Sequence, residues 1–210
     1  MTTTTQTARR VHRSRASRSL TGPALILGGL AFFVGGVTHP GDSGAGTKLQ
    51  QLHEMLVNPA WYPSHALLLA AMALFAVAVT SLRRRSDLEL AMTRVLRVVT
   101  VIAWIATASM AVHLFAAVGA DSIAGGDPSL LSRVQSVNET LVDASWGLAM
   151  AALAVAGGMT RTLGNRITIV AGLIGGLAFA LASATIAYTD TFDPLFKVGS
   201  LLSVWAVVVG

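Results

Sequence analysis

Six apolar stretches dominate this chain of 210 residues and leave little sequence between them. Most are close to the roughly 20 residues that a helix needs to cross a ~30 Å hydrocarbon core. Lipid cannot pair with backbone polar groups, so such stretches are expected as helices. The sequence therefore predicts an all-α fold, a polytopic transmembrane helical bundle of about six spans. The expected spans are approximately 20–38, 61–82, 98–120, 141–159, 167–189 and 195–210.

The chain divides into a short tail and one membrane domain. Residues 1–19 are rich in Thr and Arg and have no apolar periodicity, which predicts a disordered basic cytoplasmic tail. Residues 20–210 form the six-span domain, because the spans leave no room for a soluble one. The tail and the first stretch could also be a cleaved signal peptide. A retained span is favoured, since the stretch exceeds the usual apolar region of about 7–15 residues.

The basic residues alternate between the two sides of these stretches. Twelve of the fifteen Lys and Arg residues precede the first stretch, separate the second from the third, or separate the fourth from the fifth. Only Lys48, Arg133 and Lys197 lie on the other side. Cytoplasmic loops retain Lys and Arg, so both termini are predicted to be cytoplasmic. The net charge of +5 is spread along these segments, which favours the lipid bilayer as partner and no nucleic acid.

Composition narrows the chemistry. The chain has no cysteine, which excludes disulfides and thiolate metal sites. It contains no H-E-x-x-H, P-loop or G-x-S-x-G motif, so no reaction is predicted. Thirteen Arg against two Lys, with abundant Ala, Val and Gly, indicate a GC-rich bacterial genome. The expected location is therefore the bacterial plasma membrane.

Two outer loops are long enough to carry structure of their own. Thr47 is expected to cap a short helix, Lys48–Val57, that lies in the interface plane through its apolar face. Trp61 and Tyr62 then mark the membrane boundary, as aromatic belts do. In the second loop, Ser129 is expected to open a helical stretch that leads into the fourth span.

Ionisable residues gather at one level on the outer side. His39 closes the first span, His65 lies about one turn inside the second, and His113 lies near the outer end of the third. Asp143 begins the fourth span. At 1.5 Å per residue these depths agree within about two turns, so the four side chains could line one outer pocket. Ionisable residues within spans usually face the bundle interior and mark function.

Three interpretations of these four residues remain open. They could simply bond neighbouring helices and helix ends. Alternatively, His39, His65 and His113 could bind haem b, or hold a transition metal together with Asp143. A third interpretation is a transport path for a proton or a small solute through His113 and Asp143. The inner halves of the spans contain almost no ionisable residue, which counts against a path through the whole membrane.

Glycines and other small residues recur inside the apolar stretches, including Gly172 and Gly176 in a G-x-x-x-G arrangement. Small residues let helix backbones approach closely. They favour tight packing within the bundle, or against a second copy or a membrane-protein partner. The chain could thus also be a non-catalytic membrane subunit or scaffold.

The first hairpin carries an outer His39-Pro40 pair, followed by Trp61 and His65 at the start of the second stretch. In this pattern it resembles uncharacterised small multi-pass membrane proteins of GC-rich bacteria. The resemblance covers the first hairpin only. It implies a membrane location and no particular activity.

Overall fold

The computed structural model describes the backbone of residues 3–210 and the side chains from Leu20 onward, and every regular element in this part of the chain is helical. The helices are α1 (Thr3–Val37), α2 (Lys48–Val57), α3 (Trp61–Arg83), α4 (Leu90–His113), α5 (Ala120–Ala124), α6 (Leu130–Val137), α7 (Ala144–Met159), α8 (Arg166–Thr185), α9 (Leu195–Gly199) and α10 (Leu201–Val209). A 3-10 turn, Ala116–Gly119, precedes α5, and a π-helix, Asn138–Asp143, joins α6 to α7.

Five helical segments are long and apolar enough to cross a membrane. They are Leu20–Val37, Trp61–Arg83, Leu90–His113, Leu130–Met159 and Arg166–Thr185. The sixth apolar segment, Leu195–Val209, is shorter and is interrupted at Ser200, between α9 and α10. The expected all-α bundle is therefore confirmed, while the sixth span stays a prediction. The tail was expected to be disordered, and the backbone of residues 3–19 is helical and continuous with α1. The side chains of residues 1–19 lie outside the described part of the chain.

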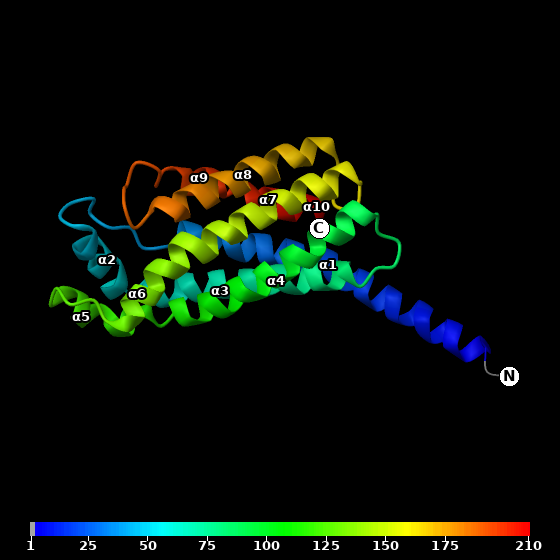
Figure 1. Cartoon of the computed structure of the whole chain (residues 1–210), viewed down its shortest axis with the longest axis horizontal. Helices are drawn as coiled ribbons and strands as arrows, with labels where there is room; N and C mark the ends of the chain where they lie inside the picture. The colour runs from blue at the N-terminus through cyan, green and yellow to red at the C-terminus, as the bar shows by residue number, and fades with distance from the viewer. Residues whose placement is uncertain (1–2) are drawn as a thin grey trace.

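The long helices form a closed ring. Along the chain, α1 packs against α3, α3 against α4, α4 against α7 and α7 against α8. The final helix, α10, packs against both α8 and α1 and so returns the chain to its start. Figure 1 shows these helices side by side with their long axes roughly parallel. This order is what short connections between successive antiparallel helices produce.

Large aromatic side chains fill the middle of the ring. Phe32 of α1 lies with its ring centroid 5.3 Å from Trp146 of α7 and 5.4 Å from Phe179 of α8. Phe75 of α3 lies 5.6 Å from Trp146, which is fully buried. The rings meet in tilted and edge-to-face arrangements, which suit aromatic pairs. Side chains from four helices thus meet at one point of the core.

Glycines bring the helix backbones together around this core. A methyl group at Gly176 of α8 would lie 2.7 Å from the carbonyl oxygen of Gly147 on α7, and one at Gly175 would lie 2.6 Å from the amide nitrogen of Leu202. Gly29 of α1 approaches the carbonyl oxygen of Ser203 on α10 in the same way. These positions accept only glycine without backbone movement. The small-residue faces are thus used inside the chain, and the scaffold proposal would need other faces.

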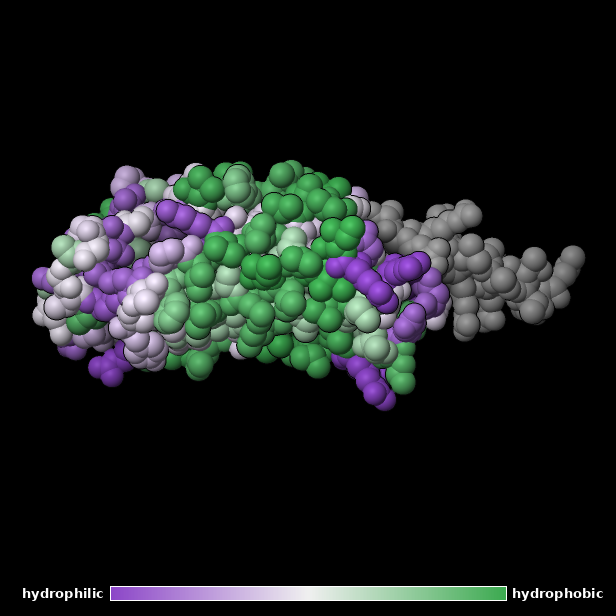
Figure 2. All heavy atoms as spheres, turned by 90° about the horizontal axis from the view of Figure 1, so that it is seen from above, coloured by the Kyte–Doolittle hydropathy of each residue, from purple (hydrophilic) through white to green (hydrophobic). Residues whose placement is uncertain are grey.

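The surface is apolar around the middle and polar at both ends (Figure 2). The α3–α4 and α7–α8 loops lie at the end from which the N-terminal part of α1 projects, and we call this the arginine-bearing end (Figure 1). Its basic residues include Arg83, Arg84 and Arg161. The opposite end holds α2, α5 and the start of α3, and we call it the histidine-bearing end.

The loop between α1 and α3 contains the helix that its sequence predicts. The Thr47 side chain accepts the backbone N–H of Gln50, whose own side chain accepts the Thr47 N–H, and the helix begins at Lys48 and ends at Val57. This capping box satisfies two amides that the first turn leaves unpaired. Leu56 packs with Trp61 and Ile123. The apolar face of α2 therefore packs against protein, whereas the sequence predicted that this face lies in the membrane interface.

The third span differs from its expected range. The helix begins at Leu90 and ends at His113, whereas the apolar pattern continues to residue 120. Two carbonyls beyond the helix end are bound by side chains of the first outer loop and α3: Trp61 Nε1 donates to Leu114 O at 3.1 Å, and His53 Nδ1 donates to Ala120 O at 3.1 Å. Such partners replace the intrahelical bonds that a helix end lacks. Hydropathy alone contains no trace of them.

Candidate functional site

Three histidines and one tryptophan lie close together at the histidine-bearing end, where His65 stacks on Trp61 and the other ring pairs are tilted. The His65 ring centroid lies 4.8 Å from those of both His39 and His113, and 3.8 Å from the indole of Trp61. The Trp61 ring also lies 5.3 Å from His113 and 6.1 Å from His39. We call these four residues the His–Trp cluster. His65 and Trp61 are 1% exposed and His113 is 4% exposed, so the middle of the cluster is shut off from solvent.

Backbone carbonyls determine which nitrogen carries the proton on two of the rings. His65 Nδ1 lies 2.7 Å from the carbonyl oxygen of Trp61, one helical turn earlier, and His39 Nδ1 lies 2.9 Å from that of Pro40. A carbonyl only accepts, so in both rings Nδ1 is the donor. The neutral rings therefore keep the lone pair on Nε2, which remains the atom that can accept a proton.

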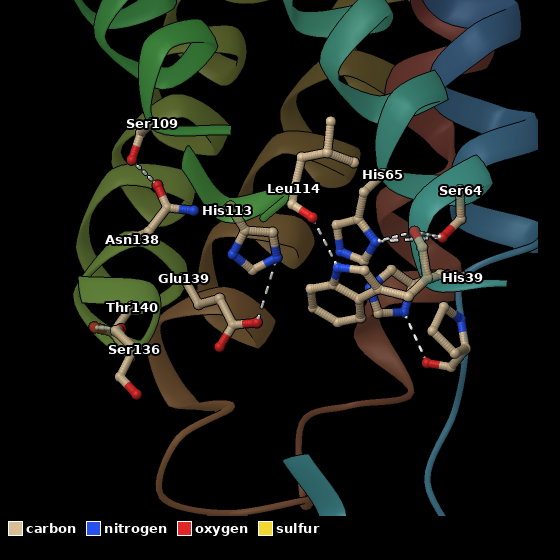
Figure 3. Close-up of polar contacts among 12 residues, drawn as sticks. His39, Ser64, His65, Ser109, His113, Leu114, Ser136, Asn138, Glu139 and Thr140 are labelled. Carbon is tan, nitrogen blue, oxygen red and sulfur yellow. Dashed lines mark hydrogen bonds and ion pairs between the residues drawn. The ribbon is translucent and has the colours of Figure 1, made fainter. Parts of the chain in front are cut away.

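His113 faces a carboxylate rather than a carbonyl. Its Nε2 lies 3.8 Å from Oε1 of Glu139, whose side chain is 17% exposed (Figure 3). Glu139 lies in the π-helix between α6 and α7. The His113 Nδ1 atom is buried and has no hydrogen-bond partner within the protein. His113 thus connects the His–Trp cluster to an acidic group on a separate helix.

The π-helix collects the polar groups on this side of the site. Asn138 accepts a hydrogen bond from the Ser109 hydroxyl of α4, while its own amide nitrogen is buried and unpartnered (Figure 3). Asp143 ends the same segment, is 7% exposed and has one buried carboxylate oxygen without a partner. Single turns of π-helix inside an α-helix are frequent at functional sites. This turn contributes all the acidic side chains of the site.

Burial lowers the pKa of His39, which lies just beyond the end of α1, and the bond to the Pro40 carbonyl opposes this only in part. Because desolvation disfavours the charged ring, His39 is neutral over the physiological range. The cluster therefore presents an uncharged imidazole toward the outer loops.

Two side-chain interactions connect α2 to its neighbouring loops at the histidine-bearing end. His53 of α2 is bonded to the Ala120 carbonyl, as noted above, and Lys48 forms an ion pair with Asp190 in the loop after α8. The Lys48 ammonium lowers the pKa of Asp190. Both side chains of this pair are partly exposed, so the pair orients α2 and adds little stability. One short helix is thereby held from two sides.

The geometry does not fit haem b. The His65 and His113 rings lie beside each other and against Trp61, with no slot for a macrocycle between them. The cavity beside His113 measures about 10 Å³, and a space of roughly 10–15 Å³ holds a single water molecule. Within the described residues, no three His, Asp or Glu side chains are arranged to hold a metal ion. Haem and metal binding thus find no support in the site.

Most of the sequence-predicted site residues do come together. The rings of His39, His65 and His113 lie next to one another at tilted angles, and Asp143 lies on the segment that supplies Glu139. Sequence reasoning missed Glu139 and Asn138 as site residues, although it placed them in the helical stretch that leads into the fourth span. It also assigned Trp61 to the membrane boundary, whereas Trp61 is buried in the cluster and Tyr62 is 46% exposed. The sequence signal that could have found Glu139 is that this second carboxylate lies four residues before Asp143.

Comparisons of the chain with protein-family models, with curated proteins and with solved structures find no match. The function has to be inferred from the geometry of the chain itself.

Proposed function

We propose that this protein lies in the bacterial plasma membrane with its histidine-bearing end on the outer face, and that the His–Trp cluster with Glu139 binds protons there. Its function in this proposal is to respond to the pH outside the cell. The five apolar helices support the membrane location, and the excess of arginine at the other end supports the orientation.

One observation carries the proposal. Among residues 20–210, the only ionisable side chains that are more than nine-tenths buried are His65, His113 and Asp143, and all three lie at the same end. Ionisable groups in a membrane interior are expensive to keep and mark proton or ion sites. A purely structural role would be served better by neutral partners.

The arrangement makes proton binding negatively cooperative. Two unit charges 4.8 Å apart, the separation of neighbouring ring centroids, repel by about 3 kcal/mol at an effective dielectric constant of 20. The rings therefore take up protons in separate steps. The apparent pKa of each step belongs to the cluster as a whole and not to one residue. The face of Trp61 stabilises a positive charge on the ring stacked against it.

The groups facing the stack come from several helices. Glu139 faces His113 from the π-helix and His39 comes from beyond the end of α1, while Asp143 lies four residues after Glu139 and Lys48 of α2 is paired with Asp190. No buried ionisable side chain continues from these groups toward the arginine-bearing end within residues 20–210. This favours a site that exchanges protons with one face only, over a transport path across the bilayer.

The test is a titration of the histidine rings in the full chain. The protein, labelled with ¹⁵N in histidine and placed in lipid nanodiscs, should show cluster ring signals that change in linked steps as the pH falls below about 6.5, the ordinary histidine pKa. His39→Gln should move the midpoints of the two remaining cluster rings by about one unit or more, because coupled groups share their protons. His53→Gln, outside the cluster, is the matched control and should leave these midpoints in place.

Independent titration of each ring would sink the proposal and would favour the non-catalytic membrane subunit. A visible spectrum and a metal analysis of the same preparation test the earlier alternatives, since haem would give a Soret band. Reporter fusions after Arg84 and after Gly126 test the orientation: the proposal requires the first inside the cell and the second outside.

A further inference from the structure

One face of α4 carries positive charge near its start and apolar side chains beyond it. Arg94 and Arg97 are both exposed, and the exposed side chains of Val101 and Trp104 follow them along the helix. The spacings of three and four residues place these four side chains in one row, which we call the α4 strip. The strip starts at the arginine-bearing end and runs toward the middle of the bundle, where the surface is apolar (Figure 2).

The apolar half of the strip is suited to contact with hydrocarbon. Trp104 Nε1 donates a hydrogen bond to the Thr80 hydroxyl of α3 at 3.0 Å, so the polar edge of the indole is bound by protein. The ring itself remains 46% exposed, and Val98, Val101 and Ile105 around it are each more than half exposed. An acyl chain can pack here without leaving a polar group unpaired, because the indole already has its partner.

The charged half of the strip has no counter-charge in the protein. The acidic residues at this end are Asp87 and Glu89, and Asp87 pairs with Arg85. Within residues 20–210, neither Arg94 nor Arg97 forms an ion pair. Arg97 lies about 10 Å along the helix from its start, next to apolar surface. A charge at such a position is costly in lipid unless the side chain extends back to the level of the headgroups.

We propose that the α4 strip binds one anionic phospholipid of the surrounding bilayer. Its phosphate lies at Arg94 and Arg97, and an acyl chain lies along Val101 and Trp104. Guanidinium groups bind phosphate oxygens through paired hydrogen bonds. A zwitterionic lipid carries its own cation beside the phosphate and gains less from two arginines. The inference rests on the membrane location proposed above, and it does not depend on proton binding at the other end.

Trp104 makes the site measurable, because the other three of the four tryptophans are at most 1% exposed. Bromine atoms on an acyl chain quench the fluorescence of an indole that they contact. The full chain is placed in nanodiscs of phosphatidylcholine with a minor, fixed fraction of phosphatidylglycerol. Bromine on phosphatidylglycerol should quench at least about five times more, per mole of brominated lipid, than bromine on phosphatidylcholine. This ratio corresponds to a single charge contact of ~1 kcal/mol.

Three variants locate the effect. The double variant Arg94→Gln, Arg97→Gln should reduce the preference to near equality. The double variant Arg161→Gln, Arg166→Gln removes the same charge from exposed positions in the α7–α8 loop and at the start of α8, so it is the matched control and should keep the preference. Trp104→Phe should abolish the quenching by both lipids, since the remaining indoles are buried.

Equal quenching by the two lipids in the wild type would overturn the lipid site and leave the membrane location intact. A preference that survives loss of both strip arginines, or one that both double variants lose equally, would also overturn it, because the charge would then act without a site. Absence of quenching by either lipid would remove the membrane location together with the site. The histidine titration decides proton binding separately.

Discussion

The interior of this bundle differs sharply between its two ends. From the arginine-bearing end to the aromatic core, glycines and apolar side chains fill the ring, and the described residues place no buried ionisable side chain there. At the histidine-bearing end, His65, His113 and Asp143 are ionisable and at most 7% exposed. Ionisable groups inside a bundle are costly to keep and mark function. The first region is arranged for packing, whereas the second keeps costly ionisable groups, as a functional site does.

The largest effect is expected where the packing is tightest. Gly176→Ala places a methyl group 2.7 Å from the Gly147 carbonyl oxygen and 2.9 Å from the Ala151 amide nitrogen, so α7 and α8 must separate. We expect a loss of about 3 kcal/mol in unfolding free energy, at the upper end of overpacking effects, measured by denaturation in mild detergent. Gly36→Ala is the control, since nothing lies within 4 Å of that position. Equal stability of the two variants would remove the contrast between the regions.

The next effect concerns pH at the polar end. Burial lowers the pKa of His39 in the folded protein below its unfolded value of about 6.5. Between these two values the unfolded chain binds more protons than the folded one, so stability falls as pH drops below about 6.5 and levels off below the folded pKa. The loss is about 1.4 kcal/mol for each unit of pKa lowering. Thermal unfolding from pH 7.5 to 5 should be less pH-dependent in His39→Gln, and an unchanged slope would refute this assignment.

Glu139→Gln sharpens the comparison because it separates proton binding from packing. The amide keeps the shape of the side chain and removes the ionisable group that faces His113. We expect unfolding free energy to change by about 1 kcal/mol or less, as for one hydrogen bond, while the histidine titration changes clearly. Loss of the fold with no change in titration would make Glu139 a structural residue.

The smallest effect is expected at the surface of the outer loops. Lys48→Met removes the ion pair with Asp190, both of whose side chains are partly exposed. Exposed pairs contribute little and are screened by salt. We expect a small decrease in melting temperature at low salt that disappears at high salt. A large decrease at both would mean that α2 depends on this pair.

Much of the fold could be predicted because membrane segments are governed by length and hydropathy. The Thr47 cap and the bounds of α2 were readable for a similar reason, since a capping box is a local pattern. Depth along each helix placed His39, His65 and His113 at one level. These predictions depend only on residue counts and on neighbours within one turn.

The rest depends on contacts between helices. At the end of α4, Trp61 Nε1 donates a hydrogen bond to the carbonyl oxygen of Leu114, just beyond His113. Glu139 reaches His113 because of the π-helix, and hydropathy has no signal for a change in helix winding. The haem and metal hypotheses counted suitable residues, and only the positions of the rings show that the histidines pack against one another and against Trp61.

The π-helix has a consequence for how this site could arise or disappear. Deleting one residue between Asn138 and Asp143 would shorten the span by only about 1.5 Å, but would turn one half of it by about 100° relative to the other. Trp146 could then stay in the core only if Glu139 swung away from His113. The loss of a single codon would therefore turn a chain that has both Trp146 in the core and Glu139 facing His113 into a bundle of similar length without this pair.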